Sequence, residues 1–554
     1  MTRRGGVRFA AVLAAAAATA ALTACSPSSS SSSGRYVSIY TGNPGAIPDN
    51  FNPFSSSVYW SGAGAVLGAV YEPLFYYNTA QAGKPAPWLG KSFTVSSDGT
   101  TYDITLNSGV SWQDGKPFTA ADVAFTYNLI RTNPALNIYG LDLASATATD
   151  DTHVTIKLKK PNFPNENALL GEVFIVPEHL WKSVDDPAKF LDTKPVGTGA
   201  FTFEKYSSQA FSLKKNPSYY VKGQPSVPGL KLVAEDGNTG GLNALNAGQV
   251  DWAGIALTDV KKSFLDKNEH NKMVVIPADI KVLIPNLTKA PYSDLKFREA
   301  LSLAIDRDSI IQKAFGGTDT PANPTTLLQP RDEAFTPAAY KGKTLTQDVA
   351  KAKQMLADAG YKTDRSGHLL GKDGKPIVIR LATVTGYTDT ITANQLLAEN
   401  FEALGIQVKQ VQQSLGAYTT ARATGDFDLL DDRINTGATP FDQFNGAFNY
   451  ALSAPVGKSA SNDFARVNDP EVQSLLAQAA ATNDEDTLAT VYGKLGTYWA
   501  ENQPYIVLSQ NGAVTTYRDE HFTGWPTNDD LWANPSNWIA QNVGYVAKQL
   551  KPRS

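Results

Sequence analysis

The sequence has very little of the chemistry that crosslinks a chain or holds a metal. Its 554 residues include one cysteine, Cys25, and five histidines. A single cysteine excludes an intramolecular disulfide, so the folded chain must depend on packing. The histidines stand far apart in the sequence, at His153, His179, His270, His368 and His521. Because metal sites gather such ligands at short spacings, we predict no metal site.

Motifs of the common enzyme classes are also missing. The sequence contains no HExxH, GxSxG or P-loop pattern, and Gly62-Ala63-Gly64 with Gly68 misses the dinucleotide fingerprint by one residue. Asp431 and Asp432 could suggest a carboxylate pair for glycoside hydrolysis, but acidic residues beside a strand end are more often a solvated rim. We therefore predict no cofactor and no enzymatic activity, and a secreted hydrolase is the last of the alternatives.

The balance of charge and hydrophobicity narrows the class of protein. The chain has 49 basic and 53 acidic side chains, a formal net charge of -4, and 42% hydrophobic residues. A slightly acidic chain argues against nucleic acid as a partner. Beyond the N-terminal segment, no apolar run is long enough for a transmembrane helix. These features predict a globular body of several domains.

The N-terminal segment carries the features of an export signal. Arg3, Arg4 and Arg8 precede an alanine-rich apolar run over residues 9–22, which is too short to span a bilayer comfortably. The following Leu22-Thr23-Ala24-Cys25 resembles a bacterial lipobox, in which the cysteine is lipidated and the preceding peptide is removed. We expect residues 1–24 to be the signal peptide, Cys25 to anchor the chain to the outer face of the cell membrane, and the serine-rich residues 25–34 to be a tether. The alternative is an ordinary secretory signal with an incidental cysteine.

Local patterns predict several helices and strands. Alternation of apolar and polar residues predicts a strand over residues 101–106, and Thr119 is placed to cap a helix over residues 120–131. Further on, residues 376–384 read as a strand, 388–404 as a helix and 406–411 as a second strand, which together form a βαβ unit with a parallel strand pair. The same alternation continues with a helix over residues 417–423 and a strand over residues 426–430.

A series of longer motifs carries a family resemblance. In chain order they are Ala86-Pro87-Trp88-Leu89-Gly90-Lys91, Trp112-Gln113-Asp114-Gly115-Lys116-Pro117-Phe118, Pro195-Val196-Gly197-Thr198-Gly199-Ala200-Phe201, Lys215-Asn216-Pro217-Ser218-Tyr219-Tyr220, Leu245-Asn246-Ala247-Gly248-Gln249-Val250-Asp251 and Phe297-Arg298-Glu299-Ala300-Leu301. In residues, spacing and order this series resembles the family 5 extracellular solute-binding proteins, the dipeptide-, oligopeptide- and nickel-binding receptors of ABC importers. The ordered matches run from Tyr71 to about Tyr517.

The resemblance implies an α/β fold of the periplasmic-binding-protein type, type II, in which two lobes joined by two crossing strands close on a ligand like a hinge. We expect the first lobe to comprise residues 35–77, 195–285 and 510–554, with an inserted subdomain at residues 78–194. The second lobe is expected at residues 286–509.

The resemblance also implies the function, a receptor that delivers its ligand to an ABC permease and its ATPase subunits. We expect a monomer that binds oligopeptides, with β-linked oligosaccharides as the second candidate and nickel as the third. A lipoprotein that senses a ligand and signals to a membrane partner is a further alternative, because it would use the same hinge.

Candidate ligand contacts come from two stretches and one aromatic pair. Peptide-binding relatives hold the peptide amino group with an aspartate in a second-lobe loop, and the comparable stretch here contains Asp431, Asp432, Arg433, Asn435 and Thr439. Near the C-terminus, Trp525 and Trp532 stand in a loop-rich stretch, where indole faces suit sugar rings or apolar side chains. The alternative is that these tryptophans pack the scaffold. Tyr59 and Trp60 are weaker candidates.

Overall fold

The computed structural model describes residues 34–59, 61–81, 85–161, 163–257 and 259–553. The predicted signal peptide, Cys25, nearly all of the tether and Trp60 lie outside the described residues. Within the described ranges, no helix combines the length and the apolar character that crossing a bilayer requires.

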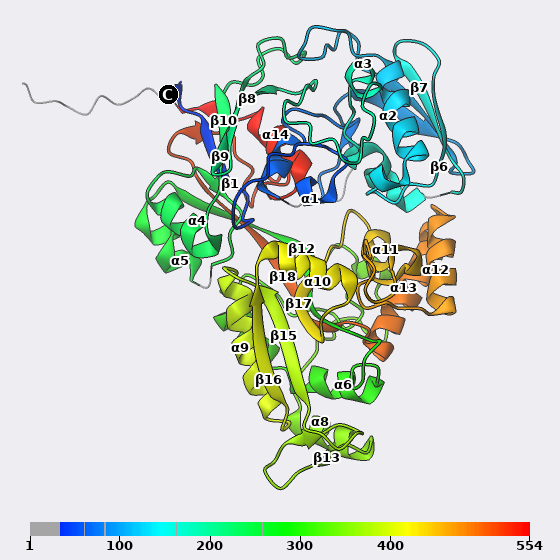
Figure 1. The fold of residues 1–554 in the computed structure, drawn as a ribbon, viewed down its shortest axis with the longest axis vertical. Coiled ribbons are helices and arrows are strands. Elements are labelled where there is room, and N and C mark those ends of the chain that lie inside the picture. Colours follow the sequence, from blue (N-terminus) through cyan, green and yellow to red (C-terminus); the bar gives the residue numbers. More distant parts are fainter. Residues whose placement is uncertain (1–33, 60, 82–84, 162, 258, 554) are drawn as a thin grey trace, which may run out of the picture.

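A ten-stranded sheet runs through both halves of the molecule (Figure 1). Its strands, in spatial order, are β16 (Gln407–Gln413), β15 (Val378–Val384), β17 (Leu429–Ile434), β12 (Asn271–Pro285), β18 (Ile506–Arg518), β11 (Trp252–Ala253), β1 (Val37–Tyr40), β10 (Gly229–Val233), β9 (Ala210–Lys215) and β8 (Phe201–Ser207). The long central strands β12 and β18 pair antiparallel. Each of them contributes to the cores of both halves.

The buried apolar side chains divide the molecule into two lobes at these central strands. Val274 and Tyr517 pack in a core with β1, β8, β9 and β10, whereas Val282 and Val507 pack in a core with β15 and β17. We call the bodies around these cores the first and the second lobe. The predicted two-lobed α/β fold with two crossing strands is confirmed, and the proposed residue boundaries of the domains stay a prediction.

The first lobe carries a separate antiparallel sheet. It consists of β4 (Gly90–Val95), β5 (Thr101–Leu106), β7 (His153–Leu158) and β6 (Leu143–Ala148), and α2 (Ala120–Thr132) packs on β6 and β7. The predicted strand at residues 101–106 and the predicted helix are both present. Thr119 is the N-cap residue of α2 and forms a capping box with Asp122. The other helices and strands of this lobe are α1 (Ser56–Tyr59), α3 (Glu178–Trp181), α4 (Gly237–Asn246), α5 (Val260–Ser263), α14 (Ala540–Ala547), β2 (Phe75–Tyr76), β3 (Ala86–Pro87), β19 (Phe522–Thr523) and β20 (Lys551–Pro552).

In the second lobe, the predicted βαβ unit is present. α9 (Thr388–Glu402) follows β15, and β15 and β16 pair in parallel. α10 (Leu415–Thr424) is also present, but the strand predicted at residues 426–430 is displaced, since β17 begins at Leu429. Phe427, one of its apolar residues, packs in the core before the strand begins. The remaining elements are α6 (Leu295–Ala304), α7 (Arg307–Lys313), α8 (Val349–Asp358), α11 (Pro440–Phe448), α12 (Pro470–Ala480), α13 (Glu485–Asn502), β13 (Lys362–Thr363) and β14 (Leu369–Leu370).

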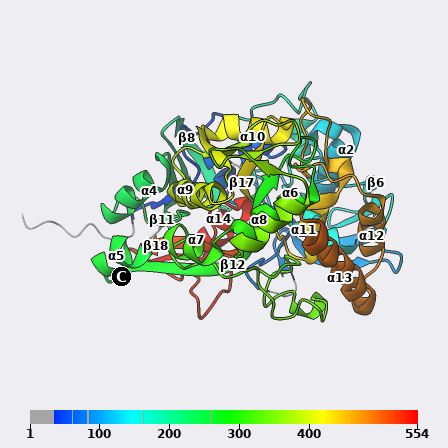
Figure 2. The same ribbon diagram turned by 90° about the horizontal axis from the view of Figure 1, so that it is seen from below.

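In the second lobe, α6 and α7 pack against the crossing strand β18, and seen from below α11, α12 and α13 form a group at one end (Figure 2). The C-terminal stretch returns to the first lobe through an unusually close helix contact. A Cβ atom at Gly544 of α14 would lie 1.6 Å from the carbonyl oxygen of Gly68, so only glycine fits at this point. The first lobe therefore contains both early and late parts of the chain.

Candidate functional site

A cavity of about 1510 Å³ lies between the two lobes. The first lobe contributes residues 41–46 and 137–142, and the second lobe contributes residues from α10, α11 and the end of β17. Asp279 and Lys281 of β12 and residues 511–514 of β18 also line the cavity. Both lobes and the strands that connect them therefore share one site.

The end of β17 presents charged side chains to this cavity. Asp432 and Arg433 line it, and each is paired: Asp432 lies 2.7 Å from Arg422, and Arg433 lies 3.9 Å from Asp279. Asp431 does not line the cavity. Its side chain is buried, one carboxylate oxygen has no hydrogen-bond partner, and burial raises its pKa well above the ordinary value.

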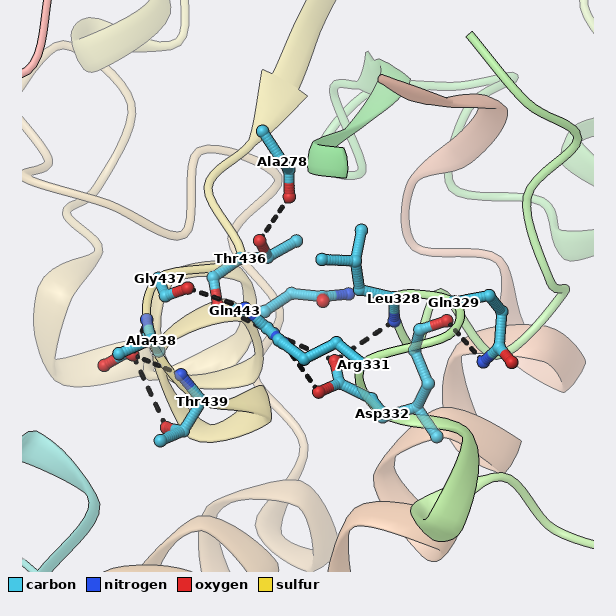
Figure 3. Close-up of polar contacts among 12 residues, drawn as sticks. Ala278, Leu328, Gln329, Arg331, Asp332, Thr436, Gly437, Ala438, Thr439 and Gln443 are labelled. Carbon is cyan, nitrogen blue, oxygen red and sulfur yellow. Dashed lines mark hydrogen bonds and ion pairs between the residues drawn. The ribbon is translucent and has the colours of Figure 1, made fainter. Parts of the chain in front are cut away.

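The loop after β17 is fastened to the rest of the second lobe (Figure 3). The Arg331 guanidinium donates to the carbonyl oxygens of Gly437 at 2.7 Å and Thr436 at 3.3 Å, and it is paired with Asp332 at 2.7 Å. The Thr436 hydroxyl donates to the carbonyl oxygen of Ala278 on the crossing strand. These contacts fix the loop from two sides, so the side chains that it carries toward the cavity are held in place.

Two predicted residues lie in this segment, and their positions differ. Asn435 lines the cavity. Thr439 does not, because it forms the N-cap of α11 and shares a capping box with Asp442. The Asp442 carboxylate accepts the backbone N–H groups of Ala438 at 2.8 Å and Thr439 at 3.0 Å.

Trp525 and Trp532 of the C-terminal stretch pack in the first lobe and do not line the cavity. Trp525 is 6% exposed, its ring stacks on Tyr517 with the centroids 4.7 Å apart, and its N–H donates to the carbonyl oxygen of Phe522 at 3.0 Å. Trp532 packs against Tyr545 with a centroid distance of 6.5 Å. This packing favours the scaffold interpretation of both residues.

Of the predicted contacts, three are brought together at the cavity: Asp432, Arg433 and Asn435. The Tyr59 side chain lies outside the described residues, as does Trp60. Whether the nine candidates contact a ligand stays a prediction.

Several further carboxylates line the cavity and were not predicted as ligand contacts, among them Glu172 of the first lobe and Asp442 of the second. Burial, with the negative charge of Asp442, raises the pKa of Glu172 to about 7. Burial also raises the pKa of Asp442 to about 6, although its carboxylate accepts two backbone N–H groups. Among the described residues, neither forms an ion pair with a basic side chain. No sequence motif marks Glu172, because only the fold brings it opposite α11.

Aromatic side chains complete the wall of the cavity. The residues are Tyr139, Phe315, Tyr387, Tyr418, Phe441, Phe464, Tyr505 and Trp538. Together with the paired and unpaired charges, they make a large site that has both apolar faces and hydrogen-bonding groups, which is the composition of a ligand-binding cleft. In the part of the chain that the structure describes, no three His, Cys, Asp or Glu side chains are grouped to hold a metal ion.

Comparisons with known proteins agree with this architecture. The model of the bacterial extracellular solute-binding proteins, family 5, matches residues 84–454. The oligopeptide-binding protein AppA of Bacillus subtilis is 27% identical over 81% of this chain and 86% of its own length. The nickel-binding periplasmic protein of Escherichia coli is 24% identical over 86% of this chain and 90% of its own length. A mannohexaose-bound periplasmic oligopeptide-binding protein of Thermotoga maritima superimposes with a TM-score of 0.84 at 25% identity, covering 94% of this chain and 99% of that one.

Proposed function

Since this chain belongs to the family 5 bacterial extracellular solute-binding proteins, we propose that it captures oligopeptides in the cavity between its lobes and delivers them to an ABC permease. Members of this family are extracytoplasmic receptors, and the family is not one of enzymes. The observation that carries the proposal is the cavity itself. Its volume of about 1510 Å³ exceeds the range of roughly 300 to 1,000 Å³ that is usual for a small-molecule pocket, and so it suits an oligomeric ligand.

The charges at the cavity support a ligand that carries an amino group. Arg422 and Arg433 are already paired with Asp432 and Asp279, whereas Glu172 and Asp442 form no close ion pair among the described residues, and only the more distant charge of Arg331 acts on Asp442. A peptide ammonium group donates three hydrogen bonds and carries the charge that these two carboxylates lack. We therefore propose Glu172 and Asp442 as acceptors for it, in preference to Asp431, which is buried away from the cavity.

A specific observation supports oligosaccharides as the second candidate. The protein from Thermotoga maritima is named as an oligopeptide-binding protein and yet was solved with mannohexaose bound. The cavity here has aromatic side chains, among them Trp538 and Tyr139, whose faces suit sugar rings. A neutral sugar has no positive charge that could pair with Glu172. A peptide and an oligosaccharide would therefore interact differently with this side of the cavity.

A binding screen separates these candidates. The purified chain is melted with peptides of three to nine residues that have free amino termini, with the same peptides after N-acetylation, and with mannohexaose and cellopentaose. A ligand that binds only the folded protein raises the melting temperature. We expect a rise with free peptides and a smaller one with acetylated peptides. A rise with the oligosaccharides alone would replace the peptide proposal by the second candidate.

We also propose that the chain is a lipoprotein tethered through Cys25 and works as a monomer with permease and ATPase subunits. Replacing Cys25 by serine is expected to move the protein from the membrane fraction to the soluble fraction, without a change in its peptide affinity. A signalling role is the alternative to import. Loss of labelled peptide uptake on deletion of the gene supports import, whereas normal uptake with a lost response supports signalling.

A further inference from the structure

The two lobes touch directly at one side of the cavity, where α4 of the first lobe meets the start of α9 (Figure 1). The Asn238 side-chain amide donates to the Asp389 carboxylate at 3.1 Å and to the Thr388 hydroxyl at 3.3 Å. The Asn238 backbone N–H donates to the carbonyl oxygen of Gly386 at 3.2 Å. We call Gly237, Asn238, Gly386, Thr388 and Asp389 the interlobe lock.

The lock is buried, so its hydrogen bonds do not compete freely with water. Asn238 is 4% exposed and Asp389 is 3% exposed. A buried carboxylate that loses its donor pays the full cost of desolvation, which makes separation of the two partners unfavourable unless water enters. Asn238 and Asp389 both line the ligand cavity. The lock therefore lies where a change in the distance between the lobes also changes the shape of the ligand cavity.

The backbones of the two lobes approach each other at a pair of glycines. A Cβ atom on Gly237 would lie 2.5 Å from the carbonyl oxygen of Gly386 and 3.0 Å from its Cα. Gly237 has a φ of +75°, a backbone conformation that residues with a side chain rarely adopt. Because a methyl group at this point would collide with the backbone of the other lobe, the contact requires glycine.

The crossing strands β12 and β18 contain a segment about which the two lobes can rotate relative to each other. The pairing of β12 with β18 shifts register between Pro277 and Ile280, and again between Lys281 and Val282. Irregular pairing leaves fewer ladder hydrogen bonds to resist rotation, and a few such residues are enough to form a hinge. On the far side of the cavity, the short helix Phe163–Asn165 lies against α11 and α12. The lobes are thus in contact on both sides of the cavity.

We infer that the interlobe lock holds the two lobes in their closed arrangement and that the Gly237–Gly386 contact limits how far they close. The inference rests on the proposed receptor function, because only a receptor gains from closure around a ligand. Apparent affinity falls in proportion to the share of molecules in the binding-competent state. The lock therefore contributes to affinity by raising the population of the closed arrangement.

The distance between the lobes can be measured directly, because the chain has one native cysteine. In a Cys25→Ser background, spin labels are attached at Asp185→Cys of the first lobe and Lys494→Cys of the second, both of which are exposed. Electron paramagnetic resonance then gives the distribution of interlobe distances in the free chain. We expect a population at the short distance of the closed arrangement.

Two variants test the lock, and one controls for backbone strain. Gly237→Ala inserts the colliding methyl group, and Asn238→Ala removes the donor. Gly109→Ala is the control, because Gly109 has a φ of +74° but would place its Cβ within 4 Å of no other atom. We expect Gly237→Ala and Asn238→Ala each to reduce the short-distance population at least fivefold, and Gly109→Ala to leave it unchanged.

Two results would overturn the inference: a free chain that has no short-distance population, or Gly237→Ala and Asn238→Ala chains that keep the distribution of the parent. The measurement needs no ligand, so it is independent of the peptide proposal. If the parent chain binds no peptide in the melting screen, the proposed ligand is wrong, while the distance distributions still decide on the lock.

Discussion

Replacing Lys281 by methionine is expected to destabilise the protein by about 3 kcal/mol, because it leaves a buried carboxylate without its counter-charge. Lys281 and Asp319 are each 4% exposed, and the Lys281 ammonium lies 3.1 Å from the Asp319 carboxylate. The same ammonium lies 3.3 Å from the centroid of the Phe315 ring. Methionine keeps the length of the side chain and its apolar contact with Phe315, so the substitution isolates the charge.

The magnitude follows from what remains around Asp319. Breaking a buried ion pair costs about 3 to 5 kcal/mol when one charge stays behind. Asp319 retains two donors, the Ser509 hydroxyl at 2.5 Å and the Gly512 N–H at 3.2 Å, and these keep the loss at the lower end of the range. Asp319→Asn in the Lys281→Met background removes the stranded charge, and so we expect it to restore more than 1 kcal/mol.

The assay is urea unfolding followed by both tryptophan fluorescence and far-ultraviolet circular dichroism, with free energies taken only where the two transitions coincide. Lys281→Arg serves as the control, because it keeps the charge. The reasoning is refuted if Lys281→Met lowers the free energy of unfolding by less than about 1 kcal/mol. It is also refuted if Asp319→Asn destabilises the Lys281→Met variant as much as it destabilises the parent chain, since the two effects would then be independent.

Three further predictions concern the tryptophan stretch, the cavity and pH. Trp525→Ala should destabilise the first lobe by about 3 to 5 kcal/mol through loss of a packed ring, and calorimetry should find unchanged peptide affinity; weaker binding would return Trp525 to the ligand site. Glu172→Gln should weaken binding of free-terminus peptides by about 1.5 to 3 kcal/mol and leave N-acetylated peptides unaffected, so equal losses for both would exclude Glu172 as the amine acceptor. Burial raises the pKa of Asp463 from an ordinary 3.8 to about 8, so the native state binds a proton more tightly than the unfolded chain, and stability falls as pH rises from about 4 to 8. Asp463→Asn should therefore raise the melting temperature at pH 8 and have little effect at pH 4, and a parallel shift at both pH values would contradict this assignment.

Much of the fold follows from local patterns in the sequence, because those patterns report on a single element at a time. The alternation at residues 101–106 predicted β5, and Thr119 marked the start of α2, since capping chemistry depends on near neighbours only. The strand expected at residues 426–430 is displaced to Leu429–Ile434. The apolar pattern could not show that Phe427 packs in the core ahead of the strand.

The site was harder to predict, because it consists of residues that only tertiary structure brings together. Asp432, Arg433 and Asn435 lie at a strand end, where sheets place their binding groups, and the structure has them at the cavity. Asp431, one residue earlier, is buried and does not line the cavity. The alternation of side chains along a strand does not account for this, because Arg433 shares the face of Asp431 and lines the cavity. Glu172 is separated from β17 by more than two hundred residues and carries no local signal.

The sharing of the first lobe between distant parts of the chain has a consequence for biogenesis. Its core contains Val37 and Ile39 together with Val543, Val546 and Leu550, so it cannot be completed until the last residues have been translocated. The second lobe is built from one continuous stretch, and its contacts are more local, which favours early folding. During export, the first lobe therefore begins to emerge before the second lobe but completes its folding after it. A chain that stops before α14 should leave the secretion machinery with a folded second lobe and an exposed, protease-sensitive first lobe.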